Sequence, residues 1–262
     1  MPSPLRAGAT AVDAAGCGSY RSGLAAAHGR ARKAEAAVGG IITFGDDGAV
    51  RQGYLARAAR ADAPGVIVLQ EWWGLVDHVK DVCDRFAAAG FHALAPDLYA
   101  GRATTKPDEA GKLMMALDIA STERTLRLAV GRLLQEPGCR VAKVGAVGFC
   151  MGGQLALYAA TENPAIGAVV DFYGIHPNVA VDLAKLEAPV LGFFAEHDAF
   201  VDASAVIGLM RAMADAGKRL EVHRLLDARH AFFNDTRPEV FHAEHAAAAW
   251  HRTLAFLSAN LA

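Results

Sequence analysis

The stretch Lys143–Gly153 reads K-V-G-A-V-G-F-C-M-G-G and gives the strongest structural signal in the chain. Val144–Val147 is a short apolar run with the length of a buried strand, and Gln154–Ala160 is an apolar, alanine-rich segment typical of a helix. Between them, residues 148–152 fit the pattern Gly-x-nucleophile-x-Gly, with the thiol of Cys150 in place of the usual hydroxyl. A strand, a tight turn and a helix in that order form the context in which such a turn presents a nucleophile.

The proposed turn makes specific demands on the residues around Cys150. Glycine is needed on both sides, because a Cβ there would collide with the neighbouring strand and helix. Cys150 would also stand at the start of a helix, where the positive end of the dipole favours thiolate over thiol. Short motifs also occur by chance, so the pentapeptide alone leaves open the alternative of a buried structural cysteine in a glycine-rich turn.

Composition excludes several classes of protein. The 262 residues are 53% hydrophobic, which is enough to bury a large core. The net charge of −2 and the lack of any run of Lys and Arg argue against nucleic-acid binding. No apolar stretch approaches the roughly 18 residues of a membrane span. The four cysteines are scattered without a C-x-x-C pair, so neither a disulfide framework nor a zinc site is expected, and a reducing, cytoplasmic location is predicted.

Residues 1–38 differ from everything that follows. They are rich in Ala and Gly, carry five Arg and Lys residues, and contain only Asp13 and Glu35 as acids. They lack the continuous apolar core of a secretory signal. An organellar transit peptide, a disordered tail and sequence upstream of a misplaced start all fit this composition. We expect a poorly ordered extension without a function, followed by a single folded domain over residues 39–262.

From Gly40 onward, predicted strands alternate with predicted helices. The expected strands are 41–44 and 50–56, which form a hairpin, then 66–69, 91–95, 144–147, 166–172, 190–194 and 220–226. The expected helices are 77–89, 113–134, 154–160, 203–216 and about 238–257. Residues 101–112 are expected to form a polar loop that leads into a helix, with Pro107, Asp108 and Glu109 suited to its first turn. Such alternation is typical of the α/β class. We predict one doubly wound, mostly parallel sheet with helices on both faces.

A nucleophilic thiol needs a base, and functional groups in open α/β sheets collect at the carboxyl ends of the strands. His230 follows the last predicted strand in a polar loop that leads to the final helix, so it can reach over the sheet to the thiol. His242 and His245 are three residues apart on the final predicted helix, a spacing that can bind metal. No third ligand lies nearby in the sequence, so no metal site is predicted there.

The acid that orients the histidine should lie between the nucleophile and the histidine in the sequence, if the order is nucleophile, acid, histidine. Asp198 and Asp171 both satisfy this condition. Asp198 follows the predicted strand 190–194 and is favoured, while Asp171 is flanked by Val170 and Phe172 and is interpreted as a structural residue. Asp198 would hold one imidazole nitrogen so that the other faces the sulfur. Asp198 could alternatively cap the following helix, but Asp202 is better placed for that role.

Glu71 closes the predicted strand 66–69 in the motif Q-E-W-W-G. A carboxylate between a buried strand and two tryptophans is costly to desolvate unless it has a partner or a role in proton transfer. The same loop is where a nucleophile turn of this kind finds one amide of its oxyanion hole, and the other comes from the residue after the nucleophile. The expected oxyanion-hole amides are therefore those of Trp72 and Met151.

Taken together, these stretches resemble the dienelactone hydrolases, which are cysteine-dependent members of the α/β-hydrolase fold. The resemblance runs from about Gly40 to the end of the chain. It is carried by Q-E-W-W-G at 70–74, A-P-D-L-Y at 95–99, G-F-C-M-G-G at 148–153, Asp198 after its strand, and H-A-F at 230–232. The resemblance implies a Cys150–His230–Asp198 triad, with Glu71 close to the thiol and helping to generate the thiolate when substrate binds.

The chain departs from the family in the residues that bind the substrate. The family's dienelactone enzymes hold the substrate carboxylate with two arginines. One follows the P-D-L-Y segment, where Arg102 is available with its position shifted by one, and the other lies four residues past the histidine, where this chain has Asn234. An asparagine cannot supply the charged, two-pronged contact that an arginine makes with a carboxylate. Arg237, three residues further on, is a possible substitute. The expected substrate-binding residues are Arg102, Asn234, and Trp73 and Tyr99 from two of the matching motifs.

The leading hypothesis is therefore a hydrolase that opens small lactones or esters through a thioacyl-enzyme, without cofactor or metal. The expected partner is a small-molecule ester or lactone, with no nucleic acid and no membrane, and a monomer is predicted. A redox-sensing or glyoxalase-like protein that uses the cysteine beside a glutamate is a second hypothesis. A non-catalytic binding module on the same fold is a third, because fold alone does not determine function.

Overall fold

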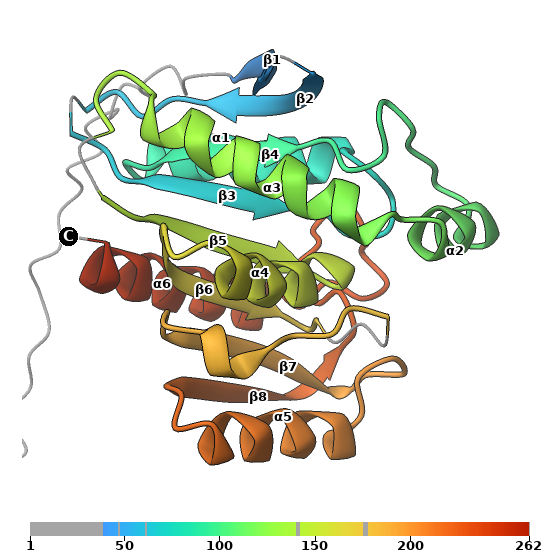
Figure 1. The fold of residues 1–262 in the computed structure, drawn as a ribbon. Coiled ribbons are helices and arrows are strands. Elements are labelled where there is room, and N and C mark those ends of the chain that lie inside the picture. The colour runs from blue at the N-terminus through green and yellow to red at the C-terminus, as the bar shows by residue number, and fades with distance from the viewer. Residues whose placement is uncertain (1–38, 47, 61, 140–141, 175–177, 262) are drawn as a thin grey trace, which may run out of the picture. The chain divides into compact units, whose positions relative to one another are not determined.

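A computed structural model describes residues 39–46, 48–60, 62–139, 142–174 and 178–261. The predicted extension over 1–38 lies outside these residues. Figure 1 shows an eight-stranded sheet with the strand order β1-β2-β4-β3-β5-β6-β7-β8. The strands are β1 (Gly40–Asp46), β2 (Ala49–Ala56), β3 (Gly65–Leu69), β4 (His92–Pro96), β5 (Val144–Phe149), β6 (Ile166–Phe172), β7 (Val190–His197) and β8 (Leu220–Arg229). The helices are α1 (Asp77–Ala88), α2 (Pro107–Met115), α3 (Ile119–Leu134), α4 (Met151–Glu162), α5 (Ala203–Asp215) and α6 (Ala243–Asn260), with a short 3₁₀ helix at Leu183–Lys185.

The sheet is mostly parallel, as the alternation of elements predicts. β1 and β2 form the expected antiparallel hairpin, and β2 also runs antiparallel to β4. Every pairing from β4 through β3 and on to β8 is parallel. This order and these directions are those of the α/β-hydrolase fold, which confirms the predicted fold class.

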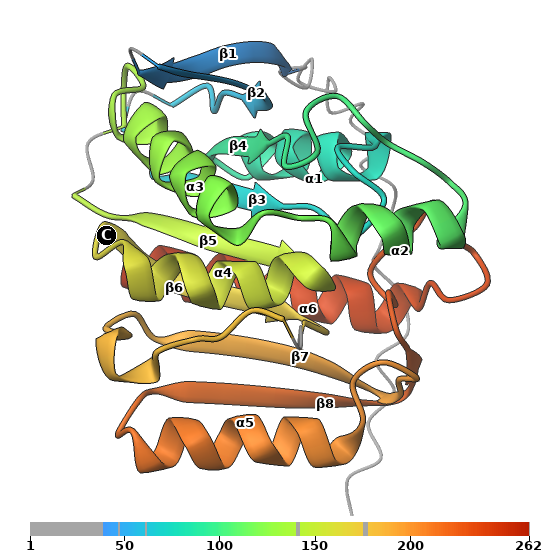
Figure 2. The same ribbon diagram turned by 45° about the vertical axis from the view of Figure 1, so that its right-hand side comes forward.

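Helices cover both faces of the sheet (Figures 1 and 2). α1 and α6 lie on one face, and α3, α4 and α5 lie on the other. The side chains of β3 show why both faces are apolar. Val66 and Val68 belong to the core under α1 and α6, while Ile67 and Leu69 belong to the core under α3 and α4. A strand buried on both faces reads as a continuous apolar run in the sequence.

All the parallel strands end on the same side of the sheet, which is the right-hand side in Figure 1. α2 lies beyond these strand ends rather than against a face of the sheet (Figure 2). The loops after β3, β5, β6, β7 and β8 therefore meet in one region. This is where open α/β sheets place their ligands.

Several predicted elements differ from the structure in their boundaries, and two helices differ most. The single helix expected over 113–134 is two helices, α2 and α3. The break occurs because Asp118 accepts a hydrogen bond from the Ser121 amide (2.6 Å) and so caps the start of α3. The last helix was expected from about 238 but begins at Ala243, where His242 is the N-terminal cap. Among the residues that the structure describes, none of the helices is long and apolar enough to cross a membrane.

Candidate active site

Cys150 lies in a sharp turn between β5 and the first residue of α4. Its backbone has φ 54° and ψ −125°, a conformation that non-glycine residues rarely adopt. The neighbouring backbone holds it there, because the Cys150 amide donates to the Phe172 carbonyl (3.0 Å) and its carbonyl accepts from Gly153 (2.8 Å). The strand–turn–helix context predicted for the nucleophile is therefore present, and the thiol stands at the positive end of α4.

The glycines on both sides of Cys150 are required by close backbone contacts, as predicted. A Cβ on Gly148 would lie 1.9 Å from the Gly152 carbonyl oxygen. A Cβ on Gly152 would lie 2.4 Å from the Leu69 carbonyl oxygen at the end of β3. Both contacts involve backbone atoms, which cannot move aside as a flexible side chain can.

Gly148→Ala is expected to destabilise the protein by about 3 kcal/mol or more, because the added methyl group would separate β5 from α4. Urea unfolding measures the change. Gly208→Ala is the matched control, since a Cβ on Gly208 in α5 would have no atom within 4 Å, and its free energy of unfolding should stay equal or rise by up to about 1 kcal/mol. Equal stability of the two variants would contradict the tight turn.

His230 and Asp198 are in direct contact. His230 follows β8, and its Nδ1 lies 2.8 Å from Asp198 Oδ2 at the end of β7. The Asp198 side chain is 1% exposed, and its other oxygen accepts hydrogen bonds from the amides of Phe200 and Val201. The acid is thus held by its own loop and oriented toward the imidazole. Asp171, the alternative acid, is fully buried and accepts a hydrogen bond from the Gly174 amide instead (2.8 Å).

The surroundings of His230 favour its protonated form. Burial alone would lower the pKa of His230, but hydrogen bonds to Asp198 and Cys150, together with the charges of these two groups, raise it to about 10. Since Nδ1 contacts Asp198, the other ring nitrogen is the one available to the thiol. At neutral pH the imidazole is therefore an imidazolium that can serve as the counter-ion of a thiolate.

These groups open onto a cavity of about 500 Å³. Its walls are mostly apolar and aromatic, and Arg237 is the one Lys or Arg residue among the described residues that line it. The lining residues are Trp72, Trp73, Pro107, Met114, Cys150, Met151, Tyr173, Phe200, Val201, His230 and Arg237. The loop after β3, the nucleophile turn, α2 and the loops after β6, β7 and β8 therefore contribute to one site. A cavity of this size accommodates a small organic molecule.

Trp72 and Met151, the predicted oxyanion-hole residues, both line this cavity beside Cys150. Within the described part of the chain, neither backbone amide donates a hydrogen bond to a protein group. Met151 is the first residue of α4, and the first amides of a helix have no partner within the helix. Both amides are consequently available to an external acceptor.

Glu71 is buried behind the cavity wall. It is 2% exposed, accepts a hydrogen bond from Asn234 Nδ2 (2.8 Å) and a longer one from the Tyr173 hydroxyl (3.4 Å), and does not itself line the cavity. The amide orientation of Asn234 is fixed by Thr236, whose backbone amide and hydroxyl both donate to Asn234 Oδ1. Asn234, which we expected to contact the substrate, is 2% exposed and contacts Glu71 instead. No Lys or Arg forms an ion pair with Glu71 among the described residues.

The structure places Arg102 and Tyr99 at a different cavity. Both line a polar cavity of about 660 Å³ between β2, the loop after β4 and the start of α3. The Tyr99 hydroxyl nevertheless reaches the Met151 sulfur (3.3 Å), so Tyr99 supports the active-site wall from behind. Arg237 and Trp73 do line the active-site cavity, with the Arg237 guanidinium 5.5 Å from the centre of a Trp73 ring.

Sequence reasoning missed several residues of the site, among them Tyr173 and Phe200. Tyr173 follows β6 directly, is fully buried and lies against His230, with 5.0 Å between ring centres. Burial and the nearby charges of Glu71 and Cys150 raise the pKa of Tyr173 well above its usual range, so its hydroxyl stays protonated. Phe200 follows Asp198 by two residues. His230 and Asp198 were identified because each follows a predicted strand. The same rule would also have identified Tyr173.

Potential metal ligands occur outside the active-site cavity. Glu196, His197 and Asp227 lie at the ends of β7 and β8, with ligand atoms within 4.8 Å of one another. His197 and Asp227 are exposed, and exposed acidic clusters are common on proteins without a metal. The rings of His242 and His245 lie 4.0 Å apart between centres, and one nitrogen of each already has a protein partner. His242 Nδ1 caps the start of α6, and His245 Nε2 contacts the Leu226 carbonyl.

Comparisons with known proteins bear on the family to which the chain belongs. The sequence profile of the Dienelactone hydrolase family matches residues 51–261. Protein usf of Aquifex pyrophilus is 35% identical over 231 residues, covering 86% of this chain and all of that protein. A provisionally named carboxymethylenebutenolidase of Aquifex aeolicus is 32% identical with the same coverage.

The crystal structure of a provisionally named dienelactone hydrolase from Klebsiella pneumoniae superposes with a TM-score of 0.77 at 29% identity. The match covers 84% of this chain and 98% of that structure. The family profile spans the strands and loops that build the cavity. The chain belongs to the dienelactone hydrolase family.

Proposed function

We propose that this protein hydrolyses small lactones or esters through a thioacyl-enzyme formed on Cys150. The observation that carries the proposal is the 2.8 Å contact between His230 and Asp198, with His230 and Cys150 lining the same cavity of about 500 Å³. Membership of a hydrolase family supports it. A thiolate paired with an imidazolium is a strong nucleophile at neutral pH.

The first half of the reaction forms the thioester. The Cys150 thiolate attacks the carbonyl carbon, and the carbonyl oxygen takes the negative charge. The amides of Trp72 and Met151 donate to this oxygen, and each such donor contributes about 3 kcal/mol to the transition state. The tetrahedral adduct collapses with cleavage of the C–O bond, and the leaving oxygen takes the proton of His230. The acyl group is then bound to sulfur and His230 is neutral.

The second half consumes one water molecule. Two of the interactions that raise the pKa of His230 come from Cys150, and the thioester removes them. The pKa of His230 is therefore lower in the acyl-enzyme, so the neutral imidazole can take a proton from water. Hydroxide adds to the thioester, the C–S bond breaks, and the acid is released. Asp198 holds the ring in one orientation throughout.

The cavity suggests a wider substrate range than the dienelactones. Arg237 lines the cavity but is paired with Glu239 (2.9 Å), Asn234 contacts Glu71, and Arg102 lines another cavity. The described part of the site thus lacks two arginines that could both bind a substrate carboxylate. Glu71 contacts the cavity wall through Tyr173, and we propose that it influences the thiolate through that hydroxyl rather than by touching the substrate.

The proposal is tested by hydrolysis of p-nitrophenyl acetate and of a dienelactone, run beside alkylation of Cys150 with iodoacetamide. We expect turnover of the simple ester, with activity lost in proportion to alkylation. Turnover of the dienelactone as well would extend the substrate range to the family's own substrate. Rapid alkylation without turnover of either substrate would contradict the hydrolase and favour a redox role for the thiol.

A further inference from the structure

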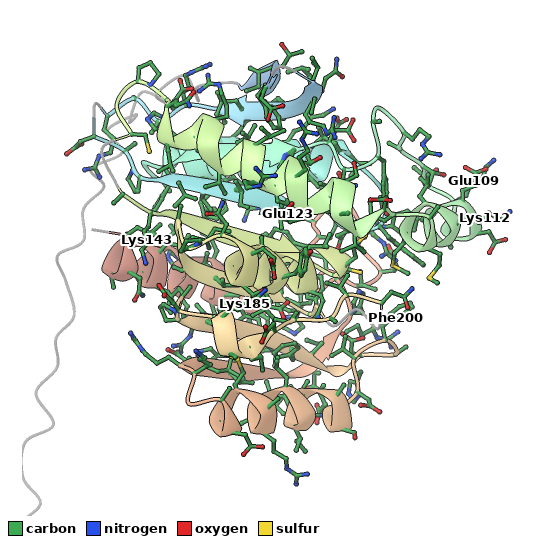
Figure 3. All side chains as sticks on the ribbon, viewed as in Figure 1. Glu109, Lys112, Glu123, Lys143, Lys185 and Phe200 are labelled. Carbon is green, nitrogen blue, oxygen red and sulfur yellow. The ribbon has the colours of Figure 1, made fainter. Side chains whose placement is uncertain are left out.

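Asp171 is an ionisable residue inside the core of the sheet. It lies on β6 and shares a face of that strand with Val169, which belongs to the apolar core under α3 and α4. The charged residues labelled in Figure 3, such as Glu109, Lys143 and Lys185, lie on the surface, whereas Asp171 is fully buried. A carboxyl group is rarely buried so completely unless its surroundings use it.

The carboxyl group of Asp171 lies where β6, α4 and the loop after β6 meet. Its Oδ1 accepts a hydrogen bond from the Gly174 amide (2.8 Å). A Cβ on Gly153, in the first turn of α4, would lie 1.9 Å from this oxygen, and a Cβ on Gly174 would lie 2.5 Å from it. Both glycines thus leave open the space that the carboxyl group fills. The other oxygen, Oδ2, is buried and has no hydrogen-bond partner among the described residues.

The contact with Asp171 holds the backbone that packs against the nucleophile turn. A Cβ on Gly174 would also lie 2.6 Å from the Cys150 carbonyl oxygen, so Gly174 is in direct contact with that turn. Tyr173, just before Gly174, has φ 48°, a conformation that its surroundings must support. The hydrogen bond from Gly174 to Asp171 spans Tyr173 and provides this support. Asp171 does not line the active-site cavity, so its influence on Cys150 passes through the backbone.

We propose that Asp171 is a positioning residue of the nucleophile turn and that it acts as a neutral carboxylic acid. Its register neighbours on β5 and β7 are Gly148 and Gly192, so no ionisable side chain faces it from either strand. Burial raises the pKa of Asp171 well above its usual range, and the Gly174 amide offsets only part of this effect. A carboxylate with one amide donor and no counter-ion is far costlier to bury than the protonated group.

A neutral Asp171 leaves the positive end of α4 to the thiol of Cys150. The carboxyl group lies against the first turn of α4, where a negative charge would weaken the stabilisation that the helix dipole gives a thiolate. Protonation therefore lets Asp171 accept the hydrogen bond from Gly174 without opposing the formation of the nucleophile. The expected effect on turnover rests on the hydrolase function proposed above, whereas the effect on the thiol does not.

The first test compares wild type with Asp171→Asn. Asparagine has the shape of the protonated acid, and its side-chain oxygen can still accept from Gly174. Alkylation by iodoacetamide is followed on the peptide that contains Cys150, and we expect its midpoint pH to be the same in both proteins. For p-nitrophenyl acetate, kcat should stay within about threefold. If Asp171 were ionised, its replacement would remove a negative charge near the sulfur and lower this midpoint by about one pH unit or more. Such a decrease would overturn the proposal.

The second test removes the acceptor with Asp171→Leu, which has a similar volume. The Gly174 amide then lacks a partner, so kcat should fall about ten- to a hundredfold while KM changes little. The midpoint pH of Cys150 alkylation should rise, because the sulfur leaves its place at the start of α4. Thr253→Val is the matched control. Thr253 is buried in α6, and its hydroxyl also lacks a hydrogen-bond partner among the described residues, so its replacement should change neither measurement.

Unchanged kcat and alkylation in Asp171→Leu would overturn the positioning role. An equal loss of kcat in Asp171→Asn and Asp171→Leu would overturn it as well, because a neutral group of the same shape should suffice. If circular dichroism shows that Asp171→Leu does not fold, Asp171→Asn alone decides the proposal. Absence of turnover by wild type would contradict the hydrolase function, but the alkylation profiles need no substrate and would still decide the role of Asp171.

Discussion

Cys150→Ala is expected to abolish hydrolysis of p-nitrophenyl acetate, with kcat/KM falling by about 10⁴-fold or more. The substitution removes the thiol that lines the cavity together with His230, and the remaining oxyanion-hole donors accelerate the reaction only modestly without it. Steady-state kinetics measures the loss. Circular dichroism should show an unchanged fold, because the backbone of the turn is held by Phe172 and Gly153 rather than by the thiol.

Cys83→Ala is the matched control. Cys83 is fully buried in α1, and desolvation raises the pKa of its thiol well above the ordinary value, so it stays an unreactive thiol. Its replacement should leave kcat/KM within about twofold and leave alkylation at neutral pH unchanged. Activity retained in Cys150→Ala would contradict the assignment of the nucleophile.

Asp198→Asn is expected to lower kcat by at least about a hundredfold. The amide cannot supply the charge that holds the imidazolium, and it leaves the ring free to adopt the wrong tautomer or orientation. Asp202→Asn, a few residues away, is the control. Asp202 caps α5 by accepting a hydrogen bond from the Ala205 amide (2.8 Å), and an asparagine caps a helix equally well. Comparable loss in both variants would contradict the pairing of Asp198 with His230.

The stability difference between wild type and Asp198→Asn is expected to depend on pH. Burial lowers the pKa of His230, but the bonds to Asp198 and Cys150 outweigh it and raise the pKa in the folded protein from 6.5 to about 10. A group with a raised folded pKa stabilises the protein fully below its unfolded pKa, and this contribution is lost as pH rises through the folded value. The free energy of unfolding of wild type should exceed that of Asp198→Asn most at pH 6 to 6.5. The difference should narrow toward pH 10 in urea titrations, and a difference that grew with pH would contradict the ion pair.

Local constraints explain what could be predicted from the sequence. Gly148 and Gly152 allow the nucleophile turn to be predicted, because backbone atoms occupy the space that a Cβ at either position would need. His230 and Asp198 were found by their place after predicted strands, since the topology brings all these strand ends together. The strand predicted over 166–172 matches β6, because continuous burial leaves an apolar run with clear limits.

Side-chain directions could not be predicted in the same way. Asn234 is four residues past His230, but only the folded chain shows that it turns inward to Glu71 and away from the cavity. Arg102 lies in a loop that faces a second cavity, although its motif matches. The break at Asp118 was missed because one capping hydrogen bond outweighs the helical periodicity that continues on both sides. Each of these outcomes depends on a tertiary or capping contact of a single side chain.

The central claim is the thioacyl-enzyme, and mass spectrometry of the protein after rapid mixing with p-nitrophenyl acetate tests it most directly. Quenching in acid preserves a thioester, and low reaction pH favours its accumulation because the neutral His230 needed for the second step becomes scarce. The account predicts one added acetyl group, located by peptide mapping on Cys150 and absent in Cys150→Ala. Release of p-nitrophenol with no acetyl group on Cys150, or with the acetyl group on another residue, would contradict it.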